Sequence, residues 1–361
     1  MIETFVASVG DGLAMGIKTV DFSTIQIDCG TQQDAQTAVN VSLCRLRPRV
    51  FILSHFHLDH YNGLFAWGPE NPPLSIQDVY FPRLPDMADQ KEYANCILAL
   101  NRRLMGDDSG VMEVDFRRAI KRINGGRPFR YCPLSKGDSF TVGSSVFNVL
   151  WPPPKVTLDG GANGVSRAIQ LFHEALQVDE RLKQAYEQIT SSDFHNPYLI
   201  QEEEEACGQV EPIEHGAVMK PVHNAHERLP LKLKAANEAL RSAANKMSLC
   251  FIEDNRFLFM GDLTKAEIPL LVQELKVLGR THFSVLITPH HGTHWHNSLN
   301  NLHCRWALSS VGPKLVGKTW PDFRNIAHEH LVTHFTGHIC LSATARRMCH
   351  PGESWSCGRE W

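Results

Sequence analysis

The segment "LSHFHLDHYNG" concentrates groups that bind metal ions. It places His55, His57, Asp59 and His60 within six positions. Imidazole and carboxylate groups are common ligands of divalent cations such as zinc. The first two histidines alternate at the end of a predicted strand, and the other two groups follow as the chain turns. Four such groups on one tight loop can serve two ions, so the sequence predicts a metal site here.

Two later segments add further candidate ligands at predicted strand ends, where α/β folds usually gather functional groups. "LFMGDL" ends a hydrophobic run with Asp262, and "LITPHHGTHWH" ends another with His290 and His291. A carboxylate can bridge two cations through its two oxygens. Gly292, after the histidine pair, allows the backbone to approach a ligand closely. We therefore expect a site for two divalent ions, zinc or manganese.

The elements that must position these groups alternate between strands and helices. "TFVASVG", "FSTIQIDCG" and "RVFILSHFH" are typical of buried strands, and a helical pattern runs from 90 to 124. The segment 163–245 contains apolar helical stripes and an alanine-rich helix. Strand, helix and strand then return, which favours α/β layering. We predict a core formed by 1–162 and 246–338, a helical insertion at 163–245, and a cysteine-containing tail at 339–361.

Composition indicates an ordinary globular protein. Of the 361 residues, 43% are hydrophobic and 21% charged. The apolar runs are far shorter than the roughly 20 residues that a membrane span requires. The first residues lack the pattern of a secretory signal, so we expect a cytoplasmic protein that does not enter a membrane.

The ten cysteines lack paired spacing, which predicts reduced thiols. Cys29, beside Asp28, is expected to be structural because it ends a buried strand. The tail gathers four potential zinc ligands, but their spacing matches no standard zinc finger. These four are Cys340, Cys349, His350 and Cys357.

The net charge of −3 is not that of a general nucleic-acid binder, yet one segment is strongly basic. Between residues 102 and 130, Lys and Arg outnumber Asp and Glu by eight to four. This segment is either a surface that faces phosphate groups or an ordinary solvated helix face. The candidates for substrate contact are Arg117, Arg118 and Arg122.

The ordered set of motifs resembles the metallo-β-lactamase superfamily. Within it, the likeness is to the hydrolase domain of the DNA-uptake protein ComEC and its stand-alone relatives. The resemblance covers roughly residues 4–151 and 245–333. The segments that carry it are "SVGDGLAMGI", "IQIDCG", "SHFHLDHYNG", "KGDSFTVGSSVFNVLWP", "NKMSLCFIEDNRFLFMGD", "TPHHGT" and "LSSVG".

The resemblance implies a four-layer αβ/βα sandwich whose two sheets face each other, with the metal site along one edge. It also implies that one cation is held by two histidines and the other by an aspartate and two histidines, with Asp262 bridging them. The implied ligands are His55 and His57 for the first cation, and Asp59, His60 and His291 for the second.

Other roles are likewise implied by the resemblance. Asp59 is expected to be essential for activity. His290 is expected to touch a substrate oxygen or to protonate the leaving group. Asp28 corresponds to a position that orients a ligand imidazole without meeting the metal. His328 follows the "SxG" strand where the relatives have another site histidine, although the proline of their pattern is missing here.

The sequence departs from the broader superfamily in one respect. Many members have a further histidine ligand between the first motif and the bridging aspartate, and no position here clearly matches it. Candidates are His173, His195, His223 and His226, and the first metal site is otherwise open. His294, His296 and His303 are expected to be scaffold or surface residues.

The predicted function is a metal-dependent phosphodiester hydrolase. Paired cations lower the pKa of a water molecule toward neutrality, so no serine or cysteine nucleophile is needed. The resemblance and the basic segment favour a nuclease acting on DNA. The resemblance also admits a role in bacterial defence under the control of a partner protein. Two alternatives stay open: a phosphodiesterase for a small molecule such as a cyclic nucleotide or a phosphorylcholine group, and a non-catalytic scaffold that binds metal.

Overall fold

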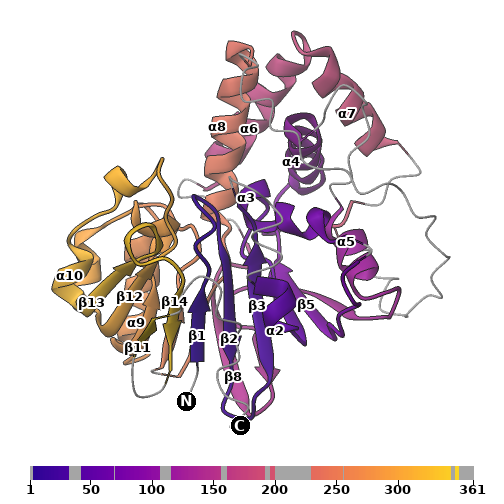
Figure 1. The fold of residues 1–361 in the computed structure, drawn as a ribbon. Helices are drawn as coiled ribbons and strands as arrows, with labels where there is room; N and C mark the ends of the chain where they lie inside the picture. The colour runs from indigo at the N-terminus through magenta and orange to yellow at the C-terminus, as the bar shows by residue number, and fades with distance from the viewer. Residues whose placement is uncertain are drawn as a thin grey trace.

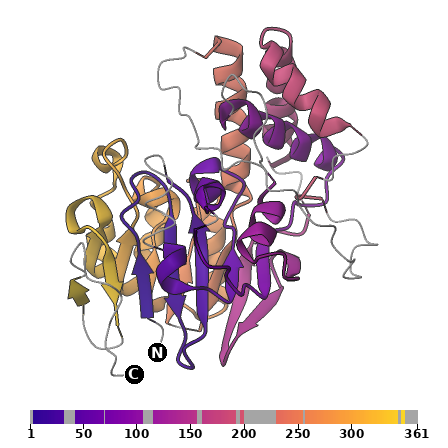
Figure 2. The ribbon, with the colours of Figure 1, turned by 45° about the vertical axis from the view of Figure 1, so that its right-hand side comes forward.

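The computed structural model of the protein describes residues 3–31, 42–68, 70–105, 115–155, 161–191, 196–199, 229–254, 256–342 and 346–348. In this part of the chain, two β-sheets lie face to face below a group of helices (Figure 1). Figure 2 shows the same arrangement after a 45° turn, with the helices above the edge of the sheets.

The first sheet combines strands from both ends of the chain. Its described strands are β1 (Glu3–Val6), β2 (Ala14–Lys18), β3 (Thr24–Cys29), β4 (Val50–Ile52), β5 (Asp78–Pro82), β6 (Arg130–Leu134), β14 (Ile339–Leu341) and β15 (Arg346–Met348). Their order is β15-β14-β1-β2-β3-β4-β5-β6. The run from β3 to β6 is parallel, so these strands end at the same edge.

The second sheet is formed by the middle and later parts of the sequence. Its described strands are β7 (Ser139–Val142), β8 (Ser145–Trp151), β9 (Cys250–Glu253), β10 (Phe257–Phe259), β11 (His282–Ile287), β12 (His303–Ser309) and β13 (Ala327–Val332). Their order is β13-β12-β11-β10-β9-β8-β7. Strands β10 to β13 are parallel, so they too deliver the residues that follow them to one edge.

Alternating side chains divide each strand between two cores. In β4, Phe51 belongs to the core outside the first sheet and Ile52 to the core between the sheets. In β10, Phe259 faces the core between the sheets, whereas Leu258 packs with Leu271 of α9 (Ile268–Val277) outside the second sheet. This is the period of two that a strand imposes. The predicted four-layer αβ/βα sandwich is confirmed.

The described helices of the predicted insertion stand on this sandwich. They are α6 (Gly161–Leu176), α7 (Glu180–Thr190) and α8 (Leu231–Lys246). Helix α6 packs on α8, and α4 (Gln90–Met105), from the preceding segment, packs on α7. Leu233, Ala236, Leu240 and Ala243 form the buried stripe of α8 at steps of three and four residues. These helices, α4, α6, α7 and α8, form one helical unit, which therefore includes a helix from before the predicted insertion.

Shorter helices fill the connections. Those that concern the site or the basic segment are α3 (Leu58–Tyr61), α5 (Phe116–Ile123) and the 3₁₀ turn η4 (Pro289–Gly292). Among the described helices, none combines the length and the apolar character needed to cross a bilayer.

The beginning of the predicted tail is part of the first sheet. Strand β14 pairs antiparallel with β1, and β15 pairs with β14. Cys340 in β14 is disulfide-bonded, so the expectation of reduced thiols fails at this residue. Among the described cysteines, those that are not disulfide-bonded are Cys29, Cys44, Cys96, Cys132, Cys250 and Cys304. Cys349, His350 and Cys357, proposed with Cys340 as a zinc knuckle, lie outside the described residues.

Candidate metal centre

Three strand ends bring the candidate ligands together. His55 and His57 follow β4, Asp262 follows β10, and His290 and His291 follow β11 within η4. Because each strand is parallel to a neighbour whose end lies at the same edge, residues far apart in the sequence meet there.

The turn that carries the histidine pair has an unusual backbone. His290 and His291 have positive φ angles of 47° and 59°, and Gly292 has a φ of 84°. A Cβ atom at Gly292 would lie 2.4 Å from Ser309 Oγ, so the turn requires glycine both for its φ angle and for space. Such left-handed residues cost free energy and persist where the surrounding structure fixes them. Here they aim two imidazoles at the centre.

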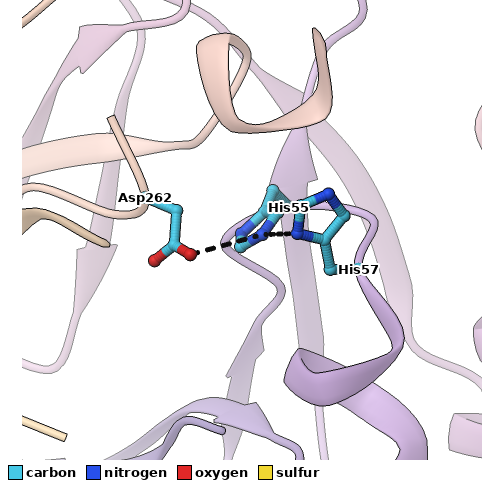
Figure 3. Close-up of side chains that lie close together, drawn as sticks. All are labelled: His55, His57 and Asp262. Carbon is cyan, nitrogen blue, oxygen red and sulfur yellow. Dashed lines mark hydrogen bonds and ion pairs between the residues drawn. The ribbon is translucent and has the colours of Figure 1, made fainter. Parts of the chain in front are cut away.

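The first ligand group joins His55, His57 and Asp262 (Figure 3). His55 Nε2 lies 2.8 Å from His57 Nδ1 and 3.8 Å from Asp262 Oδ2. All three residues are buried.

The second ligand group joins His60, His291 and the same aspartate. Asp262 Oδ2 lies 3.6 Å from His60 Nε2 and 3.4 Å from His291 Nε2. One buried carboxylate oxygen, Asp262 Oδ2, is therefore shared by two triads of potential ligand atoms.

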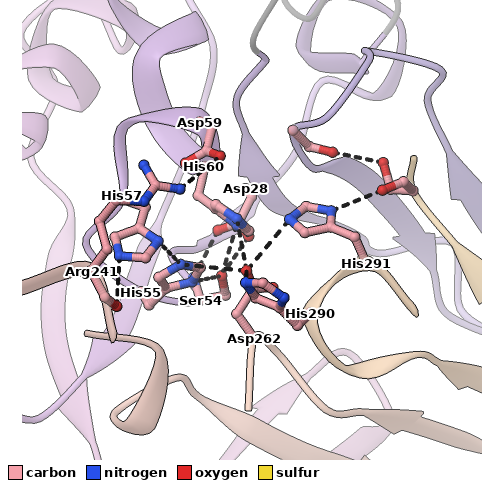
Figure 4. A network of polar contacts seen from close by, with 12 residues as sticks. Asp28, Ser54, His55, His57, Asp59, His60, Arg241, Asp262, His290 and His291 are labelled. Carbon is pink, nitrogen blue, oxygen red and sulfur yellow. Dashed lines mark hydrogen bonds and ion pairs between the residues drawn. The ribbon is translucent and has the colours of Figure 1, made fainter. Parts of the chain in front are cut away.

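Neighbouring groups fix which nitrogen each imidazole presents to the centre (Figure 4). His60 Nδ1–H donates to Asp28 Oδ2 at 2.7 Å, and His291 Nδ1–H donates to the Ser310 carbonyl at 2.8 Å. His57 Nε2–H donates to the carbonyl oxygen of Arg241 in α8 at 3.0 Å. In each ring the other nitrogen faces Asp262 or His55, as metal-ligating histidines require.

The groups that hydrogen-bond the candidate ligands form an outer layer around the centre, and Asp28 is its central buried residue. Its carboxylate also accepts hydrogen bonds from Ser54 N at 2.7 Å and from Ser54 Oγ at 2.6 Å. Since that hydroxyl donates to Asp28, it is an acceptor for His55 Nδ1 at 3.0 Å. Asp28 thus orients His60 directly and His55 through Ser54, in the position that the resemblance implies for it.

The residues present fit a divalent cation. Because His55 Nδ1 and His57 Nε2 carry the protons, His55 Nε2 and His57 Nδ1 each direct a lone pair at the other across 2.8 Å. Burial lowers the pKa of both rings well below its ordinary value, so neither readily takes a proton to relieve the contact. His60 Nε2 is buried without a hydrogen-bond partner. A divalent cation in each ligand group would satisfy these nitrogens together with Asp262.

The neighbouring histidines keep the carboxylate of Asp262 in its negatively charged form. Although burial opposes it, the surrounding histidines, His291 first, hold the pKa of Asp262 well below its ordinary value. Burial also opposes the charged form of His60, yet Asp28 and Asp262 hold the pKa of His60 well above 6.5. The pKa of His291 is raised by Asp262 against the effect of burial.

Two predicted catalytic residues border the ligand groups. Asp59 is buried, but it belongs to neither triad, and its Oδ2 lies 3.3 Å from Nη2 of Arg241. His290 Nε2 lies 3.8 Å from Asp262 Oδ2. The hydroxyl of Thr293 donates to the His290 carbonyl and lies 2.6 Å from His290 Nδ1, which can donate to it. His290 therefore presents a lone pair on Nε2 to the centre.

His328 does not lie at the centre. It is the second residue of β13, at the start of the strand, whereas the ligands follow the ends of neighbouring parallel strands. It is exposed and lines a shallow surface hollow with His282 and His303. His330, two residues on, donates or accepts a hydrogen bond at 2.8 Å with Ser309, beside the histidine turn. The proposed site role of His328 is therefore corrected by the direction of the strand.

The further histidine ligand expected in the broader superfamily has no counterpart among the described candidates. His173, on α6, hydrogen-bonds Glu92 at 2.8 Å in the helical unit. His195, His223 and His226 lie outside the described residues. Sequence reasoning missed Arg241, whose only signal is its place in a helix that directly precedes β9.

The arginines proposed to contact phosphate make contacts within the protein. Arg122 donates to the carbonyl oxygens of Leu64 and Phe65, at 3.3 and 3.4 Å. The Arg117 guanidinium lies 5.3 Å from the centre of the Tyr131 ring. Arg118 pairs with Asp115 at 3.6 Å and is largely exposed. The basic segment is thus partly engaged by the scaffold.

The solved structures compared with this chain resemble it at low sequence identity. No family model and no curated protein matches the sequence. A solved metallo-β-lactamase fold protein, YhfI from Bacillus subtilis, is 8% identical with a TM-score of 0.37, covering 92% of this chain and 95% of its own. The long form of RNase Z from yeast is 9% identical with a TM-score of 0.33, over 80% of this chain and 32% of its own. A β-lactamase domain protein from Burkholderia ambifaria is 16% identical with a TM-score of 0.23, over 41% of this chain and 46% of its own. The fold assignment therefore rests on the strand order of the chain itself.

Proposed function

We propose that the protein is a metal-dependent phosphodiester hydrolase of the metallo-β-lactamase superfamily. The observation that carries this proposal is the pair of ligand triads that share Asp262. His55, His57 and Asp262 would hold one divalent ion, and His60, His291 and Asp262 the other. When bound, such ions activate water and polarise a phosphoryl oxygen.

The residues of the chain contribute orientation and proton transfer. The bonds from Asp28, Ser310 and Arg241 hold three imidazoles with their lone pairs toward the centre. Burial, with a smaller effect of His294, lowers the pKa of His290 to about 4. His290 is therefore neutral at pH 7, and its inward lone pair favours accepting a proton over donating one to a leaving group.

The proposed substrate is DNA, and the sequence resemblance to ComEC-like hydrolases supports it. Regulation by a partner protein in bacterial defence is a further part of this proposal, which rests on the same resemblance. A second candidate is a small phosphodiester such as a cyclic nucleotide. The contact of His57 with Arg241 favours that candidate, because it places α8 directly against the ligands. A helix in this position would cover a small substrate and leave less room for a long strand.

The test is hydrolysis of labelled single-stranded DNA, RNA, a cyclic dinucleotide and bis(p-nitrophenyl) phosphate, each with manganese and with zinc. The Asp262→Asn change should reduce turnover of the preferred substrate by more than about 100-fold, because it weakens both ligand groups at once. Asp254→Asn, at the exposed turn between β9 and β10, is the matched control and should keep full activity.

Each outcome discriminates between the candidates. Preference for the long strand supports the nuclease, and preference for the cyclic dinucleotide supports the small-molecule enzyme. A protein that binds two ions and hydrolyses none of these substrates would be the metal-bound scaffold. Full activity of Asp262→Asn would refute the proposed centre.

A further inference from the structure

Arg241 reaches the candidate metal centre from the helical unit. Its main-chain carbonyl accepts the hydrogen bond from His57, and its guanidinium lies 3.3 Å from the carboxylate of Asp59 (Figure 4). Two residues of the first motif are thus contacted by a single residue that lies 182 positions from Asp59 in the sequence.

The helix that carries Arg241 is firmly anchored. Leu240 and Ala243, on either side of it in α8, are buried, and the Trp151 indole donates to the carbonyl of Lys246 at 2.6 Å. Just after the helix, Leu249 N donates to the carbonyl of Ser54, next to His55, at 2.7 Å. The position of Arg241 relative to the ligands is therefore fixed by packing on either side of it and by hydrogen bonds at the C-terminal end of the helix.

The charge of Arg241 is informative. A guanidinium is always protonated and carries five N–H donors. Its side chain is 39% exposed, so part of it is open to a ligand. Asp59 offsets part of this positive charge, and a substrate anion beside Arg241 would offset the charge that two divalent ions add. A neutral ester or lactam does not supply that negative charge, whereas a phosphodiester does.

We propose that Arg241 is a substrate-binding residue that contacts a non-bridging phosphoryl oxygen and selects phosphodiesters against neutral esters and lactams. This inference rests on the proposed function and names the residue that sets its substrate class. Asp59 holds the guanidinium beside the centre, and the planar fork of arginine suits the oxygens of a phosphoryl group.

The test measures binding without hydrolysis. Inorganic phosphate is titrated by calorimetry into the metal-loaded full-length protein and into Arg241→Met, Arg241→Lys and Lys234→Met variants. The methionine variant retains the main-chain carbonyl that bonds His57 and is a good helix former. Lys234, exposed on the same helix, is the matched control for loss of one positive charge. Bound metal is counted in every sample.

Arg241→Met should weaken phosphate binding about 10- to 100-fold with unchanged metal content, as expected for a lost charge-assisted hydrogen bond. Arg241→Lys should recover part of the affinity, because lysine keeps the charge but not the fork. Lys234→Met should change the affinity less than about twofold. The kcat/KM for bis(p-nitrophenyl) phosphate should fall in the methionine variant, while that for p-nitrophenyl acetate should not.

Three results would overturn the inference: a wild-type protein that binds no phosphate, an Arg241→Met protein that binds it as tightly as wild type, or one that loses its metal. The last would assign the side chain to holding the ligands and not the substrate. Phosphate binding that depends on Arg241 in a protein that cleaves no phosphodiester would instead refute the proposed hydrolase activity and leave the anion site standing.

Discussion

Asp28 provides a sharp test of how the outer layer supports the centre. The change Asp28→Asn keeps the shape of the side chain but removes its charge and replaces one acceptor oxygen by an NH2 group. Asp28 is fully buried and accepts three hydrogen bonds, from Ser54 N, Ser54 Oγ and His60 Nδ1. The amide satisfies part of this set and turns a donor toward the hydroxyl or the imidazole.

The expected magnitude follows from the bond to His60. A hydrogen bond to a charged group contributes about 1.5–3 kcal/mol, which corresponds to about 10- to 100-fold in an equilibrium constant. The same range applies to outer-layer partners of metal-ligating histidines. We therefore expect Asp28→Asn to weaken the affinity for zinc about 10- to 100-fold.

The assay is competition with a chromophoric chelator, accompanied by thermal unfolding of the ion-free protein. The matched control is Asp179→Asn, a buried carboxylate that caps α7 and pairs with Arg103 far from the centre. This control should lower thermal stability and leave zinc affinity unchanged. A folded Asp28→Asn protein with wild-type zinc affinity would refute the reasoning.

Two further predictions concern protons and the misplaced histidine. His60 and His291 have pKa values raised above 6.5, so in the ion-free protein they hold protons at pH 6.5 that a cation must displace. Metal affinity should therefore rise as the pH rises above 6.5, with proton release detected by calorimetry in buffers of different ionisation enthalpy; affinity that does not change up to about pH 8 would contradict this. His328→Ala should leave metal content and kcat/KM within about twofold of wild type, because substitutions of exposed residues away from a site usually have small effects. A large loss of either would show that His328 belongs to the site.

The layered fold could be predicted because buried strands alternate with helices along the sequence and several strands end in clusters of polar residues. The sandwich and the strand before the histidine turn both match the expectation. The direction and extent of "NIAHEHL" could not be read in the same way. Its first histidine, His328, is the second residue of β13, and only the pairing of β13 with β12 reveals which end of the strand lies at the metal ligands.

The candidate centre was predictable where ligand types are rare and closely spaced, as at His55 to His60. Long-range contacts were not. Nothing in an alanine-rich amphipathic helix distinguishes Arg241 from a solvated arginine, because its position depends on how α8 packs and re-enters β9. In the basic segment, the sequence predicted a phosphate contact that the structure does not favour at Arg122. Its guanidinium donates hydrogen bonds to main-chain carbonyls of the protein.

The central claim is that two ions share Asp262. A crystal structure of the protein grown with zinc or manganese, with anomalous diffraction measured at the metal edge, tests it most directly. We predict two peaks on either side of Asp262, one bound by His55 and His57 and the other by His60 and His291. An anomalous map without a peak at Asp262, from a protein saturated with metal, would contradict the account.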